Sequence, residues 1–207
     1  MTTKIKFCGI TRFEDVQAAA ELSVYAIGLV FYPPSPRAVN LNIASALSEQ
    51  CPAVITRVGL FMNQDARTIK QTIDKVELDM LQFHGQEDEA FCHSFGKPYI
   101  KSIAMGSDDD FAKAQEYQTA SAILLDSNEI GQPGGSGKTF DWKMIPQQIQ
   151  KPIILAGGLN PNNVAAAVCK VRPFAVDVSS GIESEKGIKD IDKMKQFVEA
   201  VRDADEC

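Results

Sequence analysis

The residues best suited to acid–base chemistry stand where apolar segments of the chain end. Cys8, His84, Asp126 and Asp177 each lie at or near the end of such a segment. Thiol, imidazole and carboxyl groups take up or release protons in many enzymes. Ionisable groups within apolar segments are costly to desolvate, so their presence needs a functional or a structural reason. We therefore predict that these side chains belong to one polar site.

Lys6 belongs with this set, because it stands two residues before Cys8 and side chains alternate along an extended segment. The structural alternative is that the charges form buried ion pairs. Lys6 and Asp177 would then help to fix the fold, and Asp126 would only pair with Lys6. For Cys8 the alternative is a small buried hydrophobic residue, although Gly9 beside it leaves room for other groups to approach the sulfur.

Two glycine-containing segments are suited to binding an anion through backbone N–H groups. One contains Gly157 and Gly158, and the other contains Ser180 and Gly181. Glycine lets the backbone come close to the oxygens of a phosphate. The alternative is that both segments are ordinary tight turns.

Arg37 follows a proline-rich stretch at residues 32–36. A guanidinium group can hold a carboxylate through two parallel hydrogen bonds, so Arg37 is a candidate for binding an acidic substrate. The alternative is a solvent-exposed arginine without such a role.

Strand and helix signals alternate along the whole chain and would position these residues. Apolar, β-rich segments that predict strands run over residues 5–10, 25–31, 54–61, 78–83, 99–103, 122–125, 153–156 and 174–178. Helices are predicted over residues 13–22, 42–50, 65–75, 87–95 and 108–117, from near 141, from near 161, and over 190–201.

Eight consecutive strand–helix units predict a parallel (β/α)8 barrel, an α/β fold of the TIM-barrel type, with residues 1–207 as a single catalytic domain. The alternative, a doubly wound open sheet, usually has fewer strands and a GxGxxG turn after the first strand, where this chain has Cys8-Gly9-Ile10-Thr11. In a barrel, the active site forms at the carboxyl ends of the strands, and phosphate often binds after strands seven and eight. Cys8, Asp126 and both glycine segments fall at those places.

Composition narrows the classes of partner. The net charge is −6, which disfavours non-specific binding to nucleic acid or to an anionic membrane. No apolar run is long enough to span a membrane, and the polar start of the chain does not resemble a signal peptide, so we expect a cytoplasmic protein. The five cysteines are odd in number and lack CxxC spacing, which favours reduced thiols over a disulfide framework or a zinc site.

The segment at residues 131–139 ends like a nucleotide-binding P-loop. That motif requires a glycine five residues before Gly137, and this position is Gln132. A loop that folds over the active site is the better interpretation.

Segments in all parts of the chain together resemble the phosphoribosylanthranilate isomerase family. The resemblance is carried by residues 6–11, 35–37, 58–61, 81–85, 125–126, 134–142, 156–159 and 177–181. It implies an Amadori rearrangement of N-(5-phosphoribosyl)anthranilate to 1-(2-carboxyphenylamino)-1-deoxyribulose 5-phosphate in tryptophan biosynthesis. It also implies a phosphorylated small-molecule substrate, no cofactor, no metal, and a monomer or homodimer.

The resemblance further implies roles for individual residues. Cys8 is expected to be the general base and Asp126 the general acid, Arg37 to contact the anthranilate carboxylate, and Asp177 to contact or orient the sugar. The substrate phosphate is expected at Gly157, Gly158, Ser180 and Gly181.

Other functions stay open on the sequence alone. A sister phosphate barrel, such as indole-glycerol-phosphate synthase or a histidine-pathway sugar isomerase, is one alternative. The synthase is expected to have catalytic lysine and glutamate residues at several strand ends. The histidine-pathway isomerase is expected to have an aspartate where this chain has Cys8. A barrel that binds a phosphorylated metabolite without catalysis is the other alternative.

Overall fold

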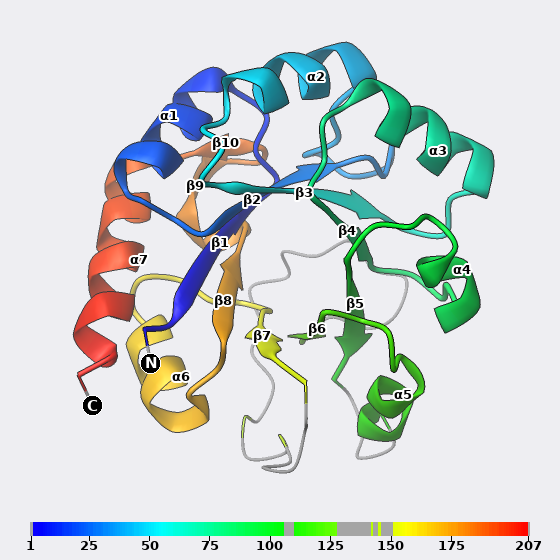
Figure 1. Ribbon diagram of the computed structural model, residues 1–207. Helices are drawn as coiled ribbons and strands as arrows, with labels where there is room; N and C mark the ends of the chain where they lie inside the picture. Colours follow the sequence, from blue (N-terminus) through cyan, green and yellow to red (C-terminus); the bar gives the residue numbers. More distant parts are fainter. Residues whose placement is uncertain (1, 106–109, 128–141, 143–144, 146–150, 207) are drawn as a thin grey trace.

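The protein folds as a closed barrel of parallel strands surrounded by helices (Figure 1). The computed structural model describes residues 2–105, 110–127, 142, 145 and 151–206. The strands follow one another around the barrel in chain order: β1 (Lys4–Cys8), β2 (Ala26–Val30), β3 (Thr56–Phe61), β4 (Met80–Phe83), β5 (Tyr99–Ala104), β6 (Ala122–Asp126), β7 (Ile153–Leu155) and β8 (Ala175–Val178). β8 pairs with β1 and closes the barrel, with Lys6 opposite Asp177 in the register.

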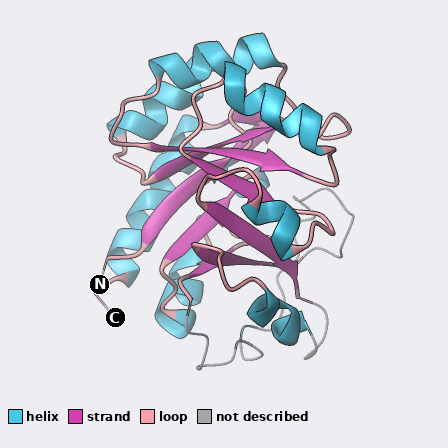
Figure 2. Ribbon diagram, turned by 45° about the vertical axis from the view of Figure 1, so that its right-hand side comes forward, coloured by secondary structure: helices cyan, strands magenta, loops and turns pink. Residues whose placement is uncertain are grey.

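The helices lie on the outside of the strands (Figure 2). Their bounds are α1 (Phe13–Glu21), α2 (Leu41–Gln50), α3 (Ala66–Lys75), α4 (Glu89–His93), α5 (Asp110–Glu116), α6 (Val164–Val171) and α7 (Ile191–Ala204). Side chains fix several of their starts: Asn40, Asp65, Asp88 and Asp190 each accept a hydrogen bond from a backbone N–H in the first turn. A short 3-10 helix, η2 (Ser180–Ile182), and a two-stranded antiparallel sheet, β9 (Glu183–Glu185) and β10 (Ile188–Lys189), follow β8.

Alternating side chains give the barrel two separate apolar cores. Apolar residues such as Ala26, Ala122 and Leu124 fill the interior of the barrel. Residues at the positions between them, such as Phe7, which packs edge-on against Phe197 of α7, fill the layer between strands and helices. The interior positions at the carboxyl ends of the strands are therefore left for polar side chains.

The predicted fold class is confirmed, and the doubly wound alternative is wrong because the sheet closes on itself. Most predicted elements match within a few residues. The first strand is shorter than predicted because Gly9 adopts a positive φ of 75° directly after Cys8. The helix predicted from near residue 141 and the loop at residues 131–139 lie outside the described residues.

One prediction about the cysteines is wrong. Cys8, Cys51 and Cys92 are free, but Cys169 is disulfide-bonded. Cys169 lies on α6, and its sulfur is 3.8 Å from the carbonyl oxygen of Ala204 at the end of α7. Packing of these two helices brings Cys169 to the carboxyl-terminal end of the chain, which cysteine spacing does not reveal.

The two ends of the described chain meet. The backbone N–H and hydroxyl of Thr3 donate hydrogen bonds to the carboxylate of Asp205. Within the described part of the chain, no helix has the length and apolar character needed to cross a membrane.

Candidate active site

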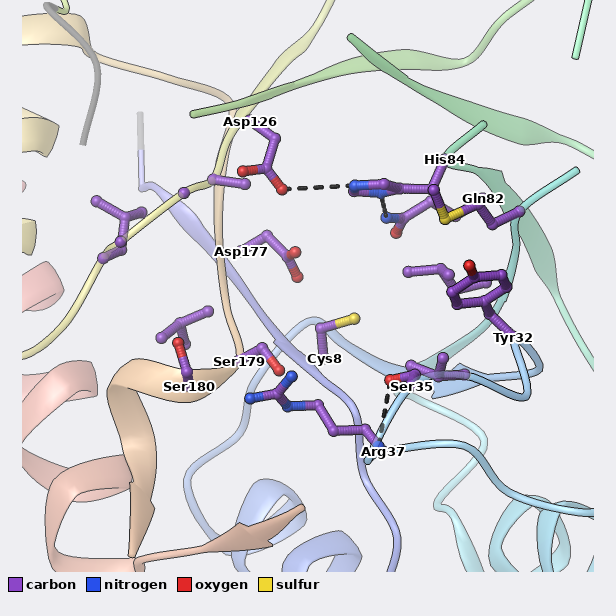
Figure 3. A pocket seen from close by; sticks show the side chains of 18 residues that line it. Cys8, Tyr32, Ser35, Arg37, Gln82, His84, Asp126, Asp177, Ser179 and Ser180 are labelled. Carbon is purple, nitrogen blue, oxygen red and sulfur yellow. Dashed lines mark hydrogen bonds and ion pairs between the residues drawn. The ribbon is translucent and has the colours of Figure 1, made fainter. Parts of the chain in front are cut away.

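A pocket opens at the carboxyl ends of the strands, and most of the predicted site residues line it (Figure 3). The predicted residues in its wall are Cys8, Arg37, His84, Asp126, Gly157, Gly158, Asp177 and Ser180. They come from β1, β6, β8 and the loops after β2, β4, β7 and β8. Barrel closure therefore brings together residues that lie far apart in the sequence.

The base candidate lies beside a buried ion pair. Lys6 Nζ donates a hydrogen bond to Asp177 Oδ1 over 2.8 Å, and their side chains are 3% and 10% exposed. Although burial opposes its charge, Asp177 and Cys8 together raise the pKa of Lys6. The buried ion pair between Lys6 and Asp177 is one of the structural alternatives predicted from the sequence. The other predicted pairing, between Lys6 and Asp126, is wrong.

Burial decides the protonation of Cys8 in the free protein. Desolvation raises the pKa of the thiol, with Asp177 acting in the same direction. Lys6 and Lys189 lower it, but they do not outweigh burial. Lys6 therefore favours the thiolate, yet burial leaves the thiol as the major form at neutral pH.

His84 faces the acid candidate across the pocket. Its Nε2 lies 3.6 Å from Asp126 Oδ2, and the Gln82 amide nitrogen lies 3.4 Å from its Nδ1. Burial lowers the pKa of His84 despite the opposing charge of Asp126, so the imidazole is neutral at neutral pH. Gln82 also donates to the Ser102 hydroxyl over 3.3 Å. A neutral imidazole can donate a hydrogen bond to Asp126 or accept one from it, without adding a positive charge to the pocket.

Arg37 is buried and paired, so the alternative of an exposed arginine is wrong. It is 7% exposed, and its Nε and Nη2 donate to Glu183 Oε1 and Oε2 over 2.6 and 2.7 Å. Figure 3 shows its guanidinium beside Cys8 and Ser179. The cation expected to meet a substrate carboxylate therefore has an acidic partner within the protein.

The glycine-rich loops after β7 and β8 lie against each other and against the pocket. Gly157 has a φ of 83°, and a side chain there would collide with the hydroxyl group and backbone nitrogen of Ser127. Gly181 does not line the pocket; a side chain there would collide with the carbonyl oxygen of Leu159. Gly181 thus permits the close approach of the two loops, and Gly157, Gly158 and Ser180 form the wall.

Sequence reasoning missed several residues of this region. Gln82 is 1% exposed and lines the pocket, and its position two residues before His84 on the same strand face could have identified it. Among the residues that the structure describes, its Oε1 has no hydrogen-bond partner. Glu183 and Lys189 carry no such signal, because they belong to a short hairpin beyond the last barrel strand.

The donor set of the pocket suits proton transfer and anion binding. Within the described residues, no group of three or more histidine, cysteine, aspartate or glutamate side chains is placed to hold a metal ion. A thiol and a carboxyl group face the same space, and cationic Arg37 and the glycine-rich loops lie around them. The fold and site define a (β/α)8-barrel enzyme with an acid–base pocket at the carboxyl ends of its strands.

Comparison with known proteins narrows this class to one family. The model of the N-(5'-phosphoribosyl)anthranilate (PRA) isomerase family matches residues 5–200. N-(5'-phosphoribosyl)anthranilate isomerase of Pseudomonas fluorescens Pf-5 is 52% identical over 202 residues, which cover 97% of this chain and 96% of that protein. The chain belongs to the phosphoribosylanthranilate isomerase family.

Solved structures agree with this assignment. Monomers generated from the dimeric phosphoribosylanthranilate isomerase of Thermotoga maritima superpose with a TM-score of 0.88 at 35% identity, covering 98% of this chain and all of that one. A phosphoribosylanthranilate isomerase in complex with reduced 1-(o-carboxyphenylamino)-1-deoxyribulose 5-phosphate gives a TM-score of 0.84 at 34% identity, with the same coverage.

Proposed function

We propose that residues 1–207 act as one catalytic domain that rearranges N-(5-phosphoribosyl)anthranilate to 1-(2-carboxyphenylamino)-1-deoxyribulose 5-phosphate in tryptophan biosynthesis. The observation that carries the proposal is the placement of Cys8 and Asp126 in the wall of one pocket, together with family membership. Since both the substrate and the product are soluble metabolites, we propose that the enzyme works in the cytoplasm.

The first half of the reaction needs an acid. Opening the ribose ring breaks the bond between C1 and the ring oxygen, and this oxygen must receive a proton as the nitrogen lone pair forms the C1=N bond. We assign this proton to Asp126. The carboxyl group is 6% exposed at the end of an apolar strand and faces a neutral His84 rather than a cationic one. A buried carboxyl group in the wall of the pocket is placed to pass a proton to a substrate oxygen there.

The second half needs a base. The C1=N bond makes the hydrogen on C2 acidic, and its removal gives an enolamine, which becomes the ketone when C1 gains a proton and the C2 hydroxyl loses one. We assign removal of the C2 proton to the Cys8 thiolate, with Lys6 and Lys189 as the cations that favour this form. All proton movements balance, as an isomerisation requires.

The remaining residues bind the two ends of the substrate. We assign the anthranilate carboxylate to Arg37 and a sugar hydroxyl to Asp177, which Lys6 holds in place. The phosphate is assigned to the loops that contain Gly157, Gly158, Ser180 and Gly181, whose backbone can approach an anion closely. Within these loops, Gly181 acts through loop packing.

The assembly is either a monomer or a homodimer. The Thermotoga maritima relative is described as dimeric and has been obtained as monomers. Either state leaves the pocket of one chain complete in all the residues assigned here.

The purified protein should remove the fluorescence of N-(5-phosphoribosyl)anthranilate as the substrate is converted. Asp126→Asn keeps the size of the side chain but lacks the transferable proton, so kcat should fall by about 10² to 10⁴. Binding of the product analogue and the thermal midpoint should stay close to wild type. A nearly normal kcat with a lower midpoint would leave Asp126 as a structural residue only.

A further inference from the structure

Arg37 belongs to a buried charge cluster with Glu183 and Lys189, and the acid–base mechanism gives Glu183 no role. Glu183 accepts two hydrogen bonds from Arg37 and a third from Lys189 Nζ over 2.9 Å. The side chains of Arg37, Glu183 and Lys189 are 8%, 5% and 0% exposed. Buried charges of this kind are expensive unless their partners are well placed.

Glu183 fixes the orientation of the guanidinium group. Its carboxylate holds the edge of Arg37 formed by Nε and Nη2, which restricts the directions in which the guanidinium group can point. The planar guanidinium makes this a rigid arrangement, which a lysine could not reproduce. Glu183 is itself held, because Lys193 Nζ donates to its backbone carbonyl over 2.8 Å.

Lys189 determines the net charge of the cluster. Its Nζ contacts three acceptors, which are Glu183 Oε1 and the carbonyl and hydroxyl oxygens of Ser179. Burial lowers the pKa of Lys189, but Glu183 opposes this change. Three acceptors match the three N–H bonds of an ammonium group, so we take Lys189 as charged. Without Lys189, Arg37 and Glu183 would form a neutral pair; with it, the cluster carries one net positive charge.

We propose that Glu183 and Lys189 determine the specificity of the pocket for an aryl carboxylate, although neither residue touches the substrate. Glu183 aims the guanidinium of Arg37, and Lys189 restores the positive charge that Glu183 neutralises. An aromatic amine with an ortho-carboxylate then meets an oriented cation, whereas the same amine without the carboxylate leaves a buried positive charge uncompensated. This inference rests on the proposed function and deepens it.

The test compares two ligands that differ in one group. The first is reduced 1-(o-carboxyphenylamino)-1-deoxyribulose 5-phosphate, and the second is its phenylamino counterpart without the carboxylate. In Lys189→Met, the Arg37–Glu183 pair remains but the net charge falls to zero. The Kd of the carboxylate ligand should rise about 10-fold or more, because the ligand carboxylate loses the attraction of one nearby positive charge at an effective dielectric constant near 20. The Kd of the second ligand should change little.

Two further variants separate charge from structure. Lys193→Met removes a lysine that also contacts Glu183, but through its backbone, so it should keep the wild-type ratio of the two Kd values. Glu183→Gln combined with Lys189→Met returns the net charge to one positive but removes the carboxylate that aims the guanidinium, so it should recover only part of the lost selectivity. Equal losses for both ligands in Lys189→Met, or recovery of the full wild-type ratio in the double variant, would overturn the inference.

Failure of the proposed function would look different. A wild-type protein that neither converts N-(5-phosphoribosyl)anthranilate nor binds the carboxylate ligand would overturn the function itself. A wild-type protein that does both, with an unchanged Kd ratio in Lys189→Met, would overturn only the role of the cluster.

Discussion

Replacing Lys6 with methionine should affect stability and the reactivity of Cys8 together. The substitution keeps most of the apolar length of the side chain and removes its charge. Asp177 then remains as a buried carboxylate without the ammonium group 2.8 Å away. Removing one partner of a buried ion pair typically costs about 3–5 kcal/mol in the free energy of unfolding. Lys6→Met combined with Asp177→Asn removes both charges and should recover most of this loss.

The effect on Cys8 follows from its distance to Lys6. The Cys8 sulfur and Lys6 Nζ lie 2.9 and 3.2 Å from the position that a Cβ would take at Gly28. They are therefore no more than about 6 Å apart, which corresponds to roughly 2–3 kcal/mol of attraction between thiolate and ammonium at an effective dielectric constant of 20. Without Lys6, the pKa of Cys8 rises further, and the thiolate population at neutral pH should fall by about 10².

Two measurements test this prediction on the same preparations. Urea unfolding gives the change in stability, and the rate at which iodoacetamide alkylates Cys8, followed by peptide mass, reports the thiolate population because the thiolate is the reactive form. Lys6→Met should slow alkylation at pH 7 about 10²-fold, and kcat/KM should fall in parallel. The double variant should regain part of the alkylation rate, since Asp177 no longer opposes the thiolate. An unfolding free energy within about 1 kcal/mol of wild type, or an unchanged alkylation rate, would refute the reasoning.

Other predictions concern residues on both sides of the pocket. Cys8→Ser should keep the fold and lower kcat by about 10² to 10⁴, because a hydroxyl group is a far weaker base; activity within twofold of wild type would remove Cys8 from the mechanism. Arg37→Ala should raise KM and leave inhibition by inorganic phosphate nearly unchanged, whereas a large loss of phosphate affinity would mean that the two anion sites are wrongly assigned. Arg37 and Lys189 lower the pKa of Glu183 below its ordinary value of 4.5, although burial acts in the opposite direction. The stability that the Glu183 carboxylate contributes is therefore present above pH 4.5 and is lost as the pH falls through the lower pKa of the folded state. Urea unfolding at pH 6 and pH 3 should show a smaller acid-dependent loss in Glu183→Gln than in wild type, and an equal loss would contradict this assignment.

The order of elements and the location of the site could be predicted from the sequence. Apolar segments that end in Cys8 and Asp126, each followed by a helix, predict strands whose carboxyl ends meet at one edge. The alternation of side chains along a strand then places Lys6 on the same face as Cys8. These inferences need only local periodicity and the rules of parallel barrels, so they hold without knowledge of which strands are neighbours.

The partners of the charged residues depended on tertiary structure. Lys6 pairs with Asp177, 171 residues away, because closure of the barrel sets β1 against β8 with these two residues in register. Arg37 meets Glu183, 146 residues away, because the hairpin after β8 packs against the loop after β2. Cys8 keeps a raised thiol pKa because burial outweighs its neighbouring cations. Local sequence identifies which groups can ionise, but their charge states depend on desolvation and on distances of a few ångströms, which only the closed barrel determines.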